Sequence, residues 1–507
     1  MATKSALKVV SKNEPVEGRK SLSKHRNVQL PLHTFEDRDN RNAEFVPFTP
    51  IQQTLRATKH NQSTETLEPG RVVKFRIYLS RFDNSAVEEN GIELSIESGK
   101  TADSKTLLFF LAKEYEIDFD VFCEMFALWM VSPLLEVQLK PYHRPYECRH
   151  GWSTLLDRFD DDPQYSHMHD EPILILRRNA TLTIEREFQL LEHYPKCAQF
   201  LIIDAREQLL LGRLQFLSLE DTVLVAAFLF CLQYGNFNER QPDVAFIRSH
   251  IEDILPERTC ESIASKTIFG KAINKKTIQE DRLLKYWEQV STTPSETEKE
   301  QKLLMTLSQT SSCYGSAWFS ARIEKKTSRV NIRNFGQGYA EVKVSIGIND
   351  RWLTIVDADS AETLLVQSID EISWQLEKSS TEQLPFLILN LSCDDPPINS
   401  ASINVSGNGN REETNFFLMV IGNQTVLIDA LLKTLTGRRI ERANSDSSSS
   451  DSSSSSAKHA SLILSKLETK DCSAMNNRKL CLAKFKNGKC TEVAGSFKSF
   501  YCHGQAL

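Results

Sequence analysis

The sequence predicts a multidomain α+β protein with three folded parts: a small sheet with one helix, a helical bundle, and a barrel of strands closed by one helix. Three observations predict this order. A densely apolar hairpin occupies residues 126–141, the apolar period changes to 3.6 near residue 185, and short strands return after Gly315. A length of 507 residues allows about three domains, and an apolar content of 40% is enough to build their cores.

The charge of the chain is unevenly distributed. The net charge is -6, but residues 1–70 carry +3 and residues 437–507 carry +6, which leaves -15 on residues 71–436. Nucleic-acid binding needs clustered lysine and arginine on a folded surface, and so does a strongly cationic membrane-docking face. The acidic body therefore argues against both kinds of partner.

The cysteine pattern and the apolar runs predict the compartment. The eleven cysteines are scattered singly, which is typical of a reducing environment. The first thirty residues contain no apolar block of the length that a signal peptide needs. The longest apolar run, residues 223–232, is about half of what a bilayer crossing requires. We expect a cytoplasmic chain that reaches a membrane only peripherally or through a partner.

Residues 1–70 are polar and proline-rich, and we expect them to be disordered. Residues 71–183 then predict a sheet wrapped on one helix. Strands are expected at 73–79 and 92–96, a helix after a cap at Asp103 or Ser104, a hairpin of strands 126–131 and 135–139 that turns at Ser132-Pro133, and a strand within 172–182. This is the element order of a ubiquitin-like sheet.

Residues 184–312 predict a four-helix bundle. One helix, marked by residues 201–210, ends at Gly212, and another, 223–234, is capped by Ser218 and ends at Gly235. A third runs near residues 275–290. The fourth is predicted to start with Thr293 as its cap, Pro294 at its first position and Glu296 closing the capping box.

Residues 313–437 predict a pleckstrin-like barrel. Strands are expected at 317–323, 340–348, 352–357, 363–366, 369–376, 385–392 and 416–421. A single helix, capped by Thr425 and ended by Gly437, is expected to plug the barrel. Residues 438–507 contain a serine and aspartate run at 445–456, and we expect this tail to be disordered.

This order resembles the FERM family, whose three lobes are a ubiquitin-like β-grasp lobe, a helical lobe like acyl-CoA-binding protein, and a PH/PTB-like barrel. FALWMV and the strand ending in LK resemble the third and fourth strands of the first lobe. The segment from Phe200 through LLLGRL to LQYG resembles the family's second lobe, and Tyr314-Gly315 resembles the entry to its third. The resemblance covers roughly residues 72–437.

Within the family, the first lobe is most similar to a group of adaptors that carry FALW-x-VSPLLEVQLKP-x-H-x-PY, which residues 126–146 nearly reproduce. His169 to Pro172 resembles their MDEP sequence. The resemblance implies a cytoplasmic adaptor that binds the cytoplasmic part of iRhom pseudoproteases and stabilises their complex with a shedding metalloprotease at the cell surface. It also implies a restraint on Wnt signalling at the co-receptor.

The sequence offers little for catalysis or metal binding. His167 and His169 could place two imidazoles on one side of a strand, but no further ligand pair lies nearby, and a polar loop explains them as well. The acidic run 160–162 is expected to be a solvated loop. The glycine-rich residues 407–410 precede a strand, so no helix N-terminus follows to hold a phosphate. Cys472, Cys481, Cys490 and Cys502 lack the close pairs of a zinc site, and we expect free thiols. We expect no enzyme, no cofactor and no metal.

The best candidate site is the fifth strand of the predicted barrel. Such a strand leaves an unpaired edge beside the closing helix, and an extended peptide can add to it through backbone hydrogen bonds. The alternative, that Ile372 and Trp374 are simply core residues, is equally well supported by the sequence. The predicted peptide-binding residues are Ile369, Ile372, Trp374, Leu376 and Val426.

A second candidate site is a basic stretch, and it supports a weaker hypothesis of lipid binding. It comprises Arg322, Lys325, Lys326, Arg329 and Arg333, which with Glu324 carry +4. An exposed charged loop explains these residues better than a binding site for inositol lipid headgroups. The corresponding function, a lipid-bound linker between membrane and cortical actin, ranks second because the chain has a serine run where a long charged helix would be expected.

Overall fold

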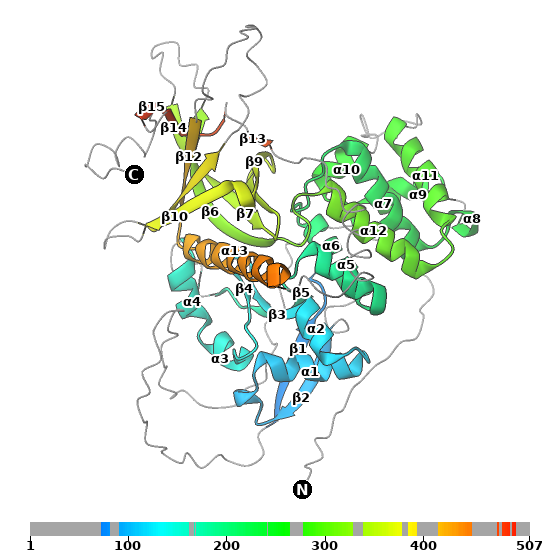
Figure 1. The fold of residues 1–507 in the computed structure, drawn as a ribbon. Coiled ribbons are helices and arrows are strands. Elements are labelled where there is room, and N and C mark those ends of the chain that lie inside the picture. Colours follow the sequence, from blue (N-terminus) through cyan, green and yellow to red (C-terminus); the bar gives the residue numbers. More distant parts are fainter. Residues whose placement is uncertain are drawn as a thin grey trace. The chain divides into compact units, whose positions relative to one another are not determined.

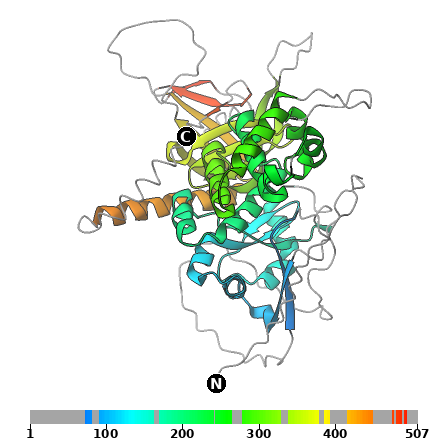
Figure 2. The same ribbon diagram turned by 90° about the vertical axis from the view of Figure 1, so that its right-hand side faces the viewer.

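Figures 1 and 2 show a computed structural model of the chain. The structure describes residues 72–81, 91–161, 167, 169–240, 242–263, 277–327, 338–377, 384–392, 414–448, 474–475, 479–486 and 489–492. Residues 1–70, which were predicted to be disordered, and the glycine-rich residues 407–410 lie outside these ranges. The chain divides into two compact units, Met1–Asp157 with Asp162–Arg177, and Arg158–Asp161 with Arg178–Leu507.

The first unit is the predicted sheet with helices. Its strands follow the order β2-β1-β5-β3-β4, in which β1 is antiparallel to β2 and parallel to β5. The helices α2, α3 and α4 were missed by the sequence analysis because each is short. The elements are β1 (Val72–Tyr78), β2 (Gly91–Glu97), α1 (Ser104–Glu114), α2 (Phe119–Met125), β3 (Phe126–Val131), β4 (Glu136–Gln138), α3 (Pro145–His150), α4 (Trp152–Phe159) and β5 (Ile173–Arg178).

The predicted apolar hairpin is present as β3 and β4, at one end of the strand order. Every residue of β3 is buried, and the turn to β4 is fixed by the Ser132 amide, which donates to Leu135 O at 2.9 Å. Asp103 caps α1 by accepting a hydrogen bond from the Thr106 amide at 2.8 Å. Strand pairing and capping here follow directly from the local sequence.

The helical part of the second unit is built around α7, which is apolar almost all round and packs against α11 and α12. Ser218 caps α7, and Gly235 follows it with a φ of 89°, a conformation that glycine tolerates best. The helices are α5 (Ile184–His193), α6 (Cys197–Leu210), α7 (Leu219–Tyr234), α8 (Phe237–Arg240), α9 (Val244–His250), α10 (Glu257–Ile263), α11 (Ile278–Ser291) and α12 (Glu296–Thr310).

The predicted cap of α12 was wrong by two residues. The hydroxyl of Ser295, and not that of Thr293, accepts the hydrogen bond from the Glu298 amide, at 3.1 Å. The Thr293 amide instead donates to Val290 O, so this residue still belongs to the turn that ends α11. Two hydroxyl residues flank Pro294, and the local sequence does not decide between them.

The second part of this unit is the barrel. Its strands follow the order β10-β11-β12-β6-β7-β8-β9-β13, and β14 pairs with both β12 and β15. The elements are β6 (Ala317–Thr327), β7 (Gly338–Ile348), β8 (Trp352–Asp357), β9 (Thr363–Ser368), β10 (Ile372–Glu377), β11 (Phe386–Ser392), β12 (Thr414–Ile421), α13 (Thr425–Ser448), β13 (Ala474–Met475), β14 (Ala483–Lys486) and β15 (Lys489–Glu492).

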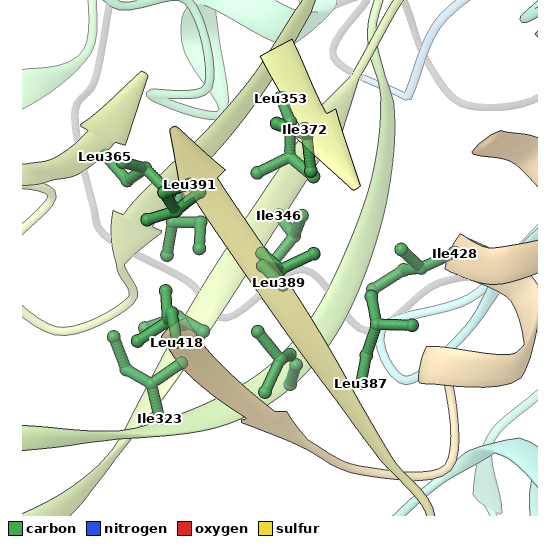
Figure 3. Close-up of a cluster of buried hydrophobic side chains, with 14 of the residues drawn as sticks. Ile323, Ile346, Leu353, Leu365, Ile372, Leu387, Leu389, Leu391, Leu418 and Ile428 are labelled. Atoms are coloured by element: carbon green, nitrogen blue, oxygen red, sulfur yellow. The ribbon is translucent and has the colours of Figure 1, made fainter. Parts of the chain in front are cut away.

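The barrel encloses one apolar core, to which α13 contributes (Figure 3). Ile346 and Leu389 lie at its centre, and Ile428 reaches in from α13 toward Leu387. Ile428 and Leu432 are both fully buried, so the predicted apolar stripe of the closing helix does plug the barrel.

Three features of the barrel differ from the sequence prediction. Ile369–Glu371 forms a 3-10 turn, so the fifth strand begins only at Ile372. Helix α13 continues past Gly437 to Ser448 (Figure 2), because glycine weakens a helix without ending it. The tail beyond it, predicted to lack structure, contributes β13, β14 and β15. Among the described residues, no helix is long and apolar enough to cross a bilayer.

A buried ion pair ties α5 to the segment that leads from α12 into the barrel. Arg178 Nε donates to Glu187 Oε2 at 2.5 Å, and Tyr314 Oη donates to Glu187 Oε1 at 2.6 Å. Arg178 also donates to Gly315 O at 3.3 Å. Burial and the charge of Glu187 raise the pKa of Tyr314 well above its usual value, so the phenol stays a donor. We call Arg178, Glu187 and Tyr314 the junction cluster.

Asn349 extends this connection into the barrel. Its Nδ2 donates to Ser312 O at 2.7 Å and to Tyr314 O at 3.0 Å, which lie just after α12. Its Oδ1 accepts from the amides of Arg351 at 2.9 Å and Trp352 at 2.8 Å. One buried side chain therefore ties the end of the helical part to the turn between β7 and β8.

Candidate peptide-binding edge

Strand β10 lies at one end of the barrel sheet. It pairs with β11 along its whole length, from Ile372 opposite Leu391 to Glu377 opposite Phe386. No other strand of the described residues pairs with β10. Its outer margin therefore presents backbone N–H and C=O groups that a further strand could complete. We call this margin, together with the neighbouring start of α13, the β10 edge.

The side chains of β10 alternate between two environments. Ile372 is buried, Trp374 and Leu376 are half-buried against the barrel core, and Ser373 and Gln375 are exposed. The apolar face is directed toward the core, and α13 passes close to this strand. A strand added to β10 would thus lie beside both apolar side chains (Trp374, Leu376) and polar ones (Ser373, Gln375).

A short polar chain links β10 to α13. Trp374 Nε1 donates to Asp429 Oδ1 at 3.1 Å, and Lys433 Nζ lies 2.8 Å from Asp429 Oδ2. Asp429 is buried, whereas the ammonium of Lys433 lies in solvent. These bonds fix the indole ring between strand and helix, and the ion pair of Asp429 with Lys433 is neutral overall.

The loop before α13 is held by the acidic run that was predicted to be a solvated loop. Asp161 Oδ1 accepts a hydrogen bond from the Asn423 amide at 2.8 Å, and Asp160 O accepts one from Asn423 Nδ2 at 3.0 Å. Gly422 has a φ of 143°, which favours glycine, and a Cβ there would lie 2.6 Å from Asp161 Oδ2, so the carboxylate would have to move. The prediction was wrong for Asp161, whose partner lies far away in the sequence.

The predicted peptide-binding residues fall into two groups. Ile369 and Ile372 are core residues, at 2% and 7% exposure. Trp374, Leu376 and Val426 are half-buried. The sequence analysis missed Asp429 and Lys433; their spacing of four on the closing helix was the available signal. Whether any of these residues binds a peptide stays a prediction.

Three of the predicted lipid-binding cations, Arg322, Lys325 and Lys326, lie among the described residues, and two of them pair with carboxylates. Arg322 pairs with Glu341 at 3.1 Å, and Lys325 pairs with Asp357 at 2.6 Å. The Lys326 amide donates to Lys479 O in the tail. Arg329 and Arg333 lie outside the described residues. Each described ion pair reduces the positive charge that could attract a phosphate group, and lipid binding stays a prediction.

The Lys325–Asp357 pair leads to a prediction about pH. Burial opposes ionisation of Asp357, but hydrogen bonds from Lys325 and Ser360 outweigh burial and lower its pKa to about 2. A lowered pKa stabilises the fold above about pH 4, and this contribution is lost as the pH falls through about 2. We expect Asp357→Asn to cost about 2 kcal/mol at neutral pH, and this cost should shrink steadily below about pH 4 and largely disappear as the pH falls through about 2.

Urea unfolding at stepped pH measures this difference, and Asp359→Asn, at an exposed neighbour, is the matched control. A constant difference between Asp357→Asn and the natural chain across the whole pH range would contradict the ion-pair explanation.

The remaining candidates from the sequence are His167, His169 and the tail cysteines. No group of three or more histidine, cysteine, aspartate or glutamate side chains among the described residues could hold a metal ion. His167 Nδ1 lies 3.1 Å from Asp157 Oδ1, so this histidine has a structural partner. Cys481 is a buried thiol that forms no disulfide bond.

Several curated proteins with similar sequences share one name. A protein named FERM domain-containing protein 8 from Homo sapiens is 28% identical over 284 residues, 54% of this chain and 59% of that protein. Its namesake from Mus musculus is 29% identical over 283 residues, with the same shares, and that from Xenopus laevis 27% over 258 residues, 50% and 55%. The chain thus spans somewhat more than half the length of these relatives.

Other comparisons give weaker matches. No protein-family model matches the chain. A solved myosin VII MyTH4-FERM domain from Dictyostelium discoideum has a TM-score of 0.46 and 12% identity, and covers 73% of this chain and 61% of its own. The element order described above confirms the predicted multidomain α+β fold, and the curated relatives to which the chain is similar carry the FERM name.

Proposed function

From this homology to proteins named FERM domain-containing protein 8, we propose that the chain is a non-enzymatic FERM adaptor. Its task is to bind an extended segment from the cytoplasmic region of a membrane protein. The observation that carries this proposal is the position of β10 at the end of the barrel sheet, with its outer margin beside α13. A strand margin next to a helix is a recurrent peptide-binding arrangement.

Two kinds of interaction act at this edge. Backbone hydrogen bonds to β10 supply affinity that is independent of sequence, and side chains of the peptide that meet Trp374, Leu376 and Val426 supply selectivity. The bond from Trp374 to Asp429 keeps the indole in place before the ligand arrives. Such pre-organisation reduces the entropy lost on binding.

We propose an iRhom-like pseudoprotease as the partner, in keeping with the motif at residues 126–146. Stabilising an iRhom–sheddase complex and restraining a Wnt co-receptor are the proposed consequences. Both place the chain in the cytoplasm, peripheral at the plasma membrane or cell cortex. The alternative, a lipid-bound linker to the cytoskeleton, has less support because Arg322 and Lys325 are paired with carboxylates.

A charge at the β10 edge tests the proposal. Trp374→Asp removes the indole and places a carboxylate beside Asp429, so we expect at least a tenfold loss of binding to the cytoplasmic region of an iRhom. The matched control is Ser373→Asp, which adds the same charge on the exposed face of the same strand. Isothermal titration of the purified full chain against that region measures both.

The control is expected to bind like the natural chain. Equal affinity of Trp374→Asp and the natural chain would rule out the β10 edge as the binding site, and no binding by either would contradict the iRhom-like partner.

A further inference from the structure

The strands β6 and β12 diverge within the barrel. Within these two described strands, pairing is confined to Ile323 opposite Val420 and Arg322 opposite Ile421. After this pairing β6 continues to Thr327. Strand β12 begins earlier in the sequence, at Thr414, and reaches the pairing only at its end. Each strand therefore has a stretch that the other does not complete, and unpaired backbone groups inside a barrel need partners. We call this gap in the pairing the β6–β12 seam.

The chain's own tail supplies those partners. The Lys326 amide donates to Lys479 O at 2.7 Å, and the Cys481 amide donates to Glu324 O at 3.2 Å. A few residues later, β14 pairs with the first half of β12, and Figure 1 shows the two strands side by side. Residues 479–486, which we call the tail strand, thus bind one margin of the seam with their first half and the other margin with their second.

The first half of the tail strand is part of the barrel core. Leu480 is 0% exposed and Leu482 is 6% exposed. Both belong to the same apolar cluster as Ile323 and Leu418, which Figure 3 shows near each other. Segments that only rest on a surface do not bury two leucines to this extent.

The second half covers the opposite face of the sheet. Ala483 is fully buried against Ile388 and Met419, and Phe485 packs on the same cluster. The ring of Phe485 meets that of Phe417 edge-on, with centroids 5.0 Å apart. The seam therefore contacts two leucines on one face of the tail strand, and an alanine and a phenylalanine on its other face.

Polar contacts fix the register of the tail strand. Lys479 forms an ion pair with Glu362, and Cys481 Sγ donates to Glu324 Oε2 at 3.6 Å. Lys484 Nζ lies 5.6 Å from the centroid of the Phe416 ring. A shift of one residue would exchange the inward and outward side chains and break all of these contacts.

We propose that the β6–β12 seam is a strand-binding site of its own, separate from the β10 edge, and that its ligand is the chain's own tail strand bound in cis. Residues 449–473 form the connection, which holds the tail strand near the seam at a high effective concentration. A competing strand with the same side-chain pattern can therefore displace the tail strand from the seam only if it is abundant or if the connection has been cut.

Cutting the connection tests this proposal without altering any contact. A protease site is inserted within residues 449–456 of the full chain, and the purified protein is cleaved and analysed by gel filtration at micromolar concentration. We expect the tail fragment to elute with the body. With Leu480→Asp and Leu482→Asp in the fragment, affinity should fall more than about 100-fold, because two carboxylates would enter the core, and the fragment should elute alone.

The matched control is Leu462→Asp with Leu464→Asp, the same change elsewhere in the same tail. This fragment should stay bound. All substitutions lie in the released fragment, so the body keeps its natural sequence, and circular dichroism of the body checks its folding. An excess of a synthetic peptide of residues 474–492 should displace the natural fragment, whereas the same peptide with both aspartates should not.

Three results would overturn the proposal. The natural fragment could leave the body at micromolar concentration, or the control fragment could leave as readily as the doubly substituted one. The uncut chain could also elute as a dimer whose tails are exchanged between two copies, in which case the tail strand binds in trans.

Discussion

Replacing Arg178 by methionine is expected to lower the free energy of unfolding of the second unit by about 3–5 kcal/mol. The guanidinium is 4% exposed, and its partner Glu187 is completely buried. Without Arg178, the carboxylate keeps only the hydroxyl of Tyr314 from the junction cluster. A buried charge that has lost its counter-ion costs several kcal/mol, far more than the loss of an exposed pair.

Thermal and urea unfolding followed by circular dichroism measure this change, and the midpoint should fall by roughly 5–15 °C. The matched control is Arg322→Met, which breaks the exposed pair with Glu341 and should cost about 1 kcal/mol or less. The double variant Arg178→Met with Glu187→Leu should recover part of the loss, because it removes both charges. A double variant less stable than Arg178→Met would contradict this account.

Asn349→Asp is expected to cost about 2–4 kcal/mol although it changes the shape of the side chain very little. The amide donates to two carbonyl oxygens, Ser312 O and Tyr314 O. A carboxylate turns these two attractions into repulsions between oxygen atoms, in a site where the residue is only 2% exposed. The deficit should shrink as the pH falls, because protonation restores one donor.

Urea unfolding at neutral and acidic pH measures this effect. Asn415→Asp, at a half-buried position on β12, is the matched control and should change the stability by no more than about 0.5 kcal/mol. A deficit for Asn349→Asp that stays constant with pH would show that packing, and not the lost donor, is responsible.

Both predictions concern the connection between the helices and the barrel, which the sequence did not reveal. Arg178 and Glu187 are nine positions apart, but Tyr314 and Asn349 come from distant segments. A buried polar group is recognisable only when its partners are known, because arginine, glutamate and asparagine are usually exposed.

Local patterns predicted most of the barrel and much of the sheet. Alternating apolar residues placed β3, β8 and β11 within a residue or two, and capping residues placed the starts of α1 and α7. The short helices of the first unit, the 3-10 turn at Ile369 and the cap at Ser295 were missed. In each of these, neighbouring residues support two local conformations equally, and packing decides between them.

The candidate site was predicted only in outline. The sequence predicted an outer strand beside the closing helix. Alternation with a period of two indicates that one face of this strand is buried, but it does not indicate which residues cover that face. The structure therefore had to separate Ile369 and Ile372, which are core, from Trp374, which bonds to Asp429.

The sequence by itself determined the order of sheet, helices and barrel, because hydrophobic period, caps and turns act over a few residues. Only the tertiary structure decided which strand margins are occupied. The apolar residues of the tail strand do not indicate by themselves which strands they join, and the segment becomes a strand here because β6 and β12 leave backbone groups and core volume for it. Pairing between residues about 157 positions apart is a property of the fold and not of any local pattern.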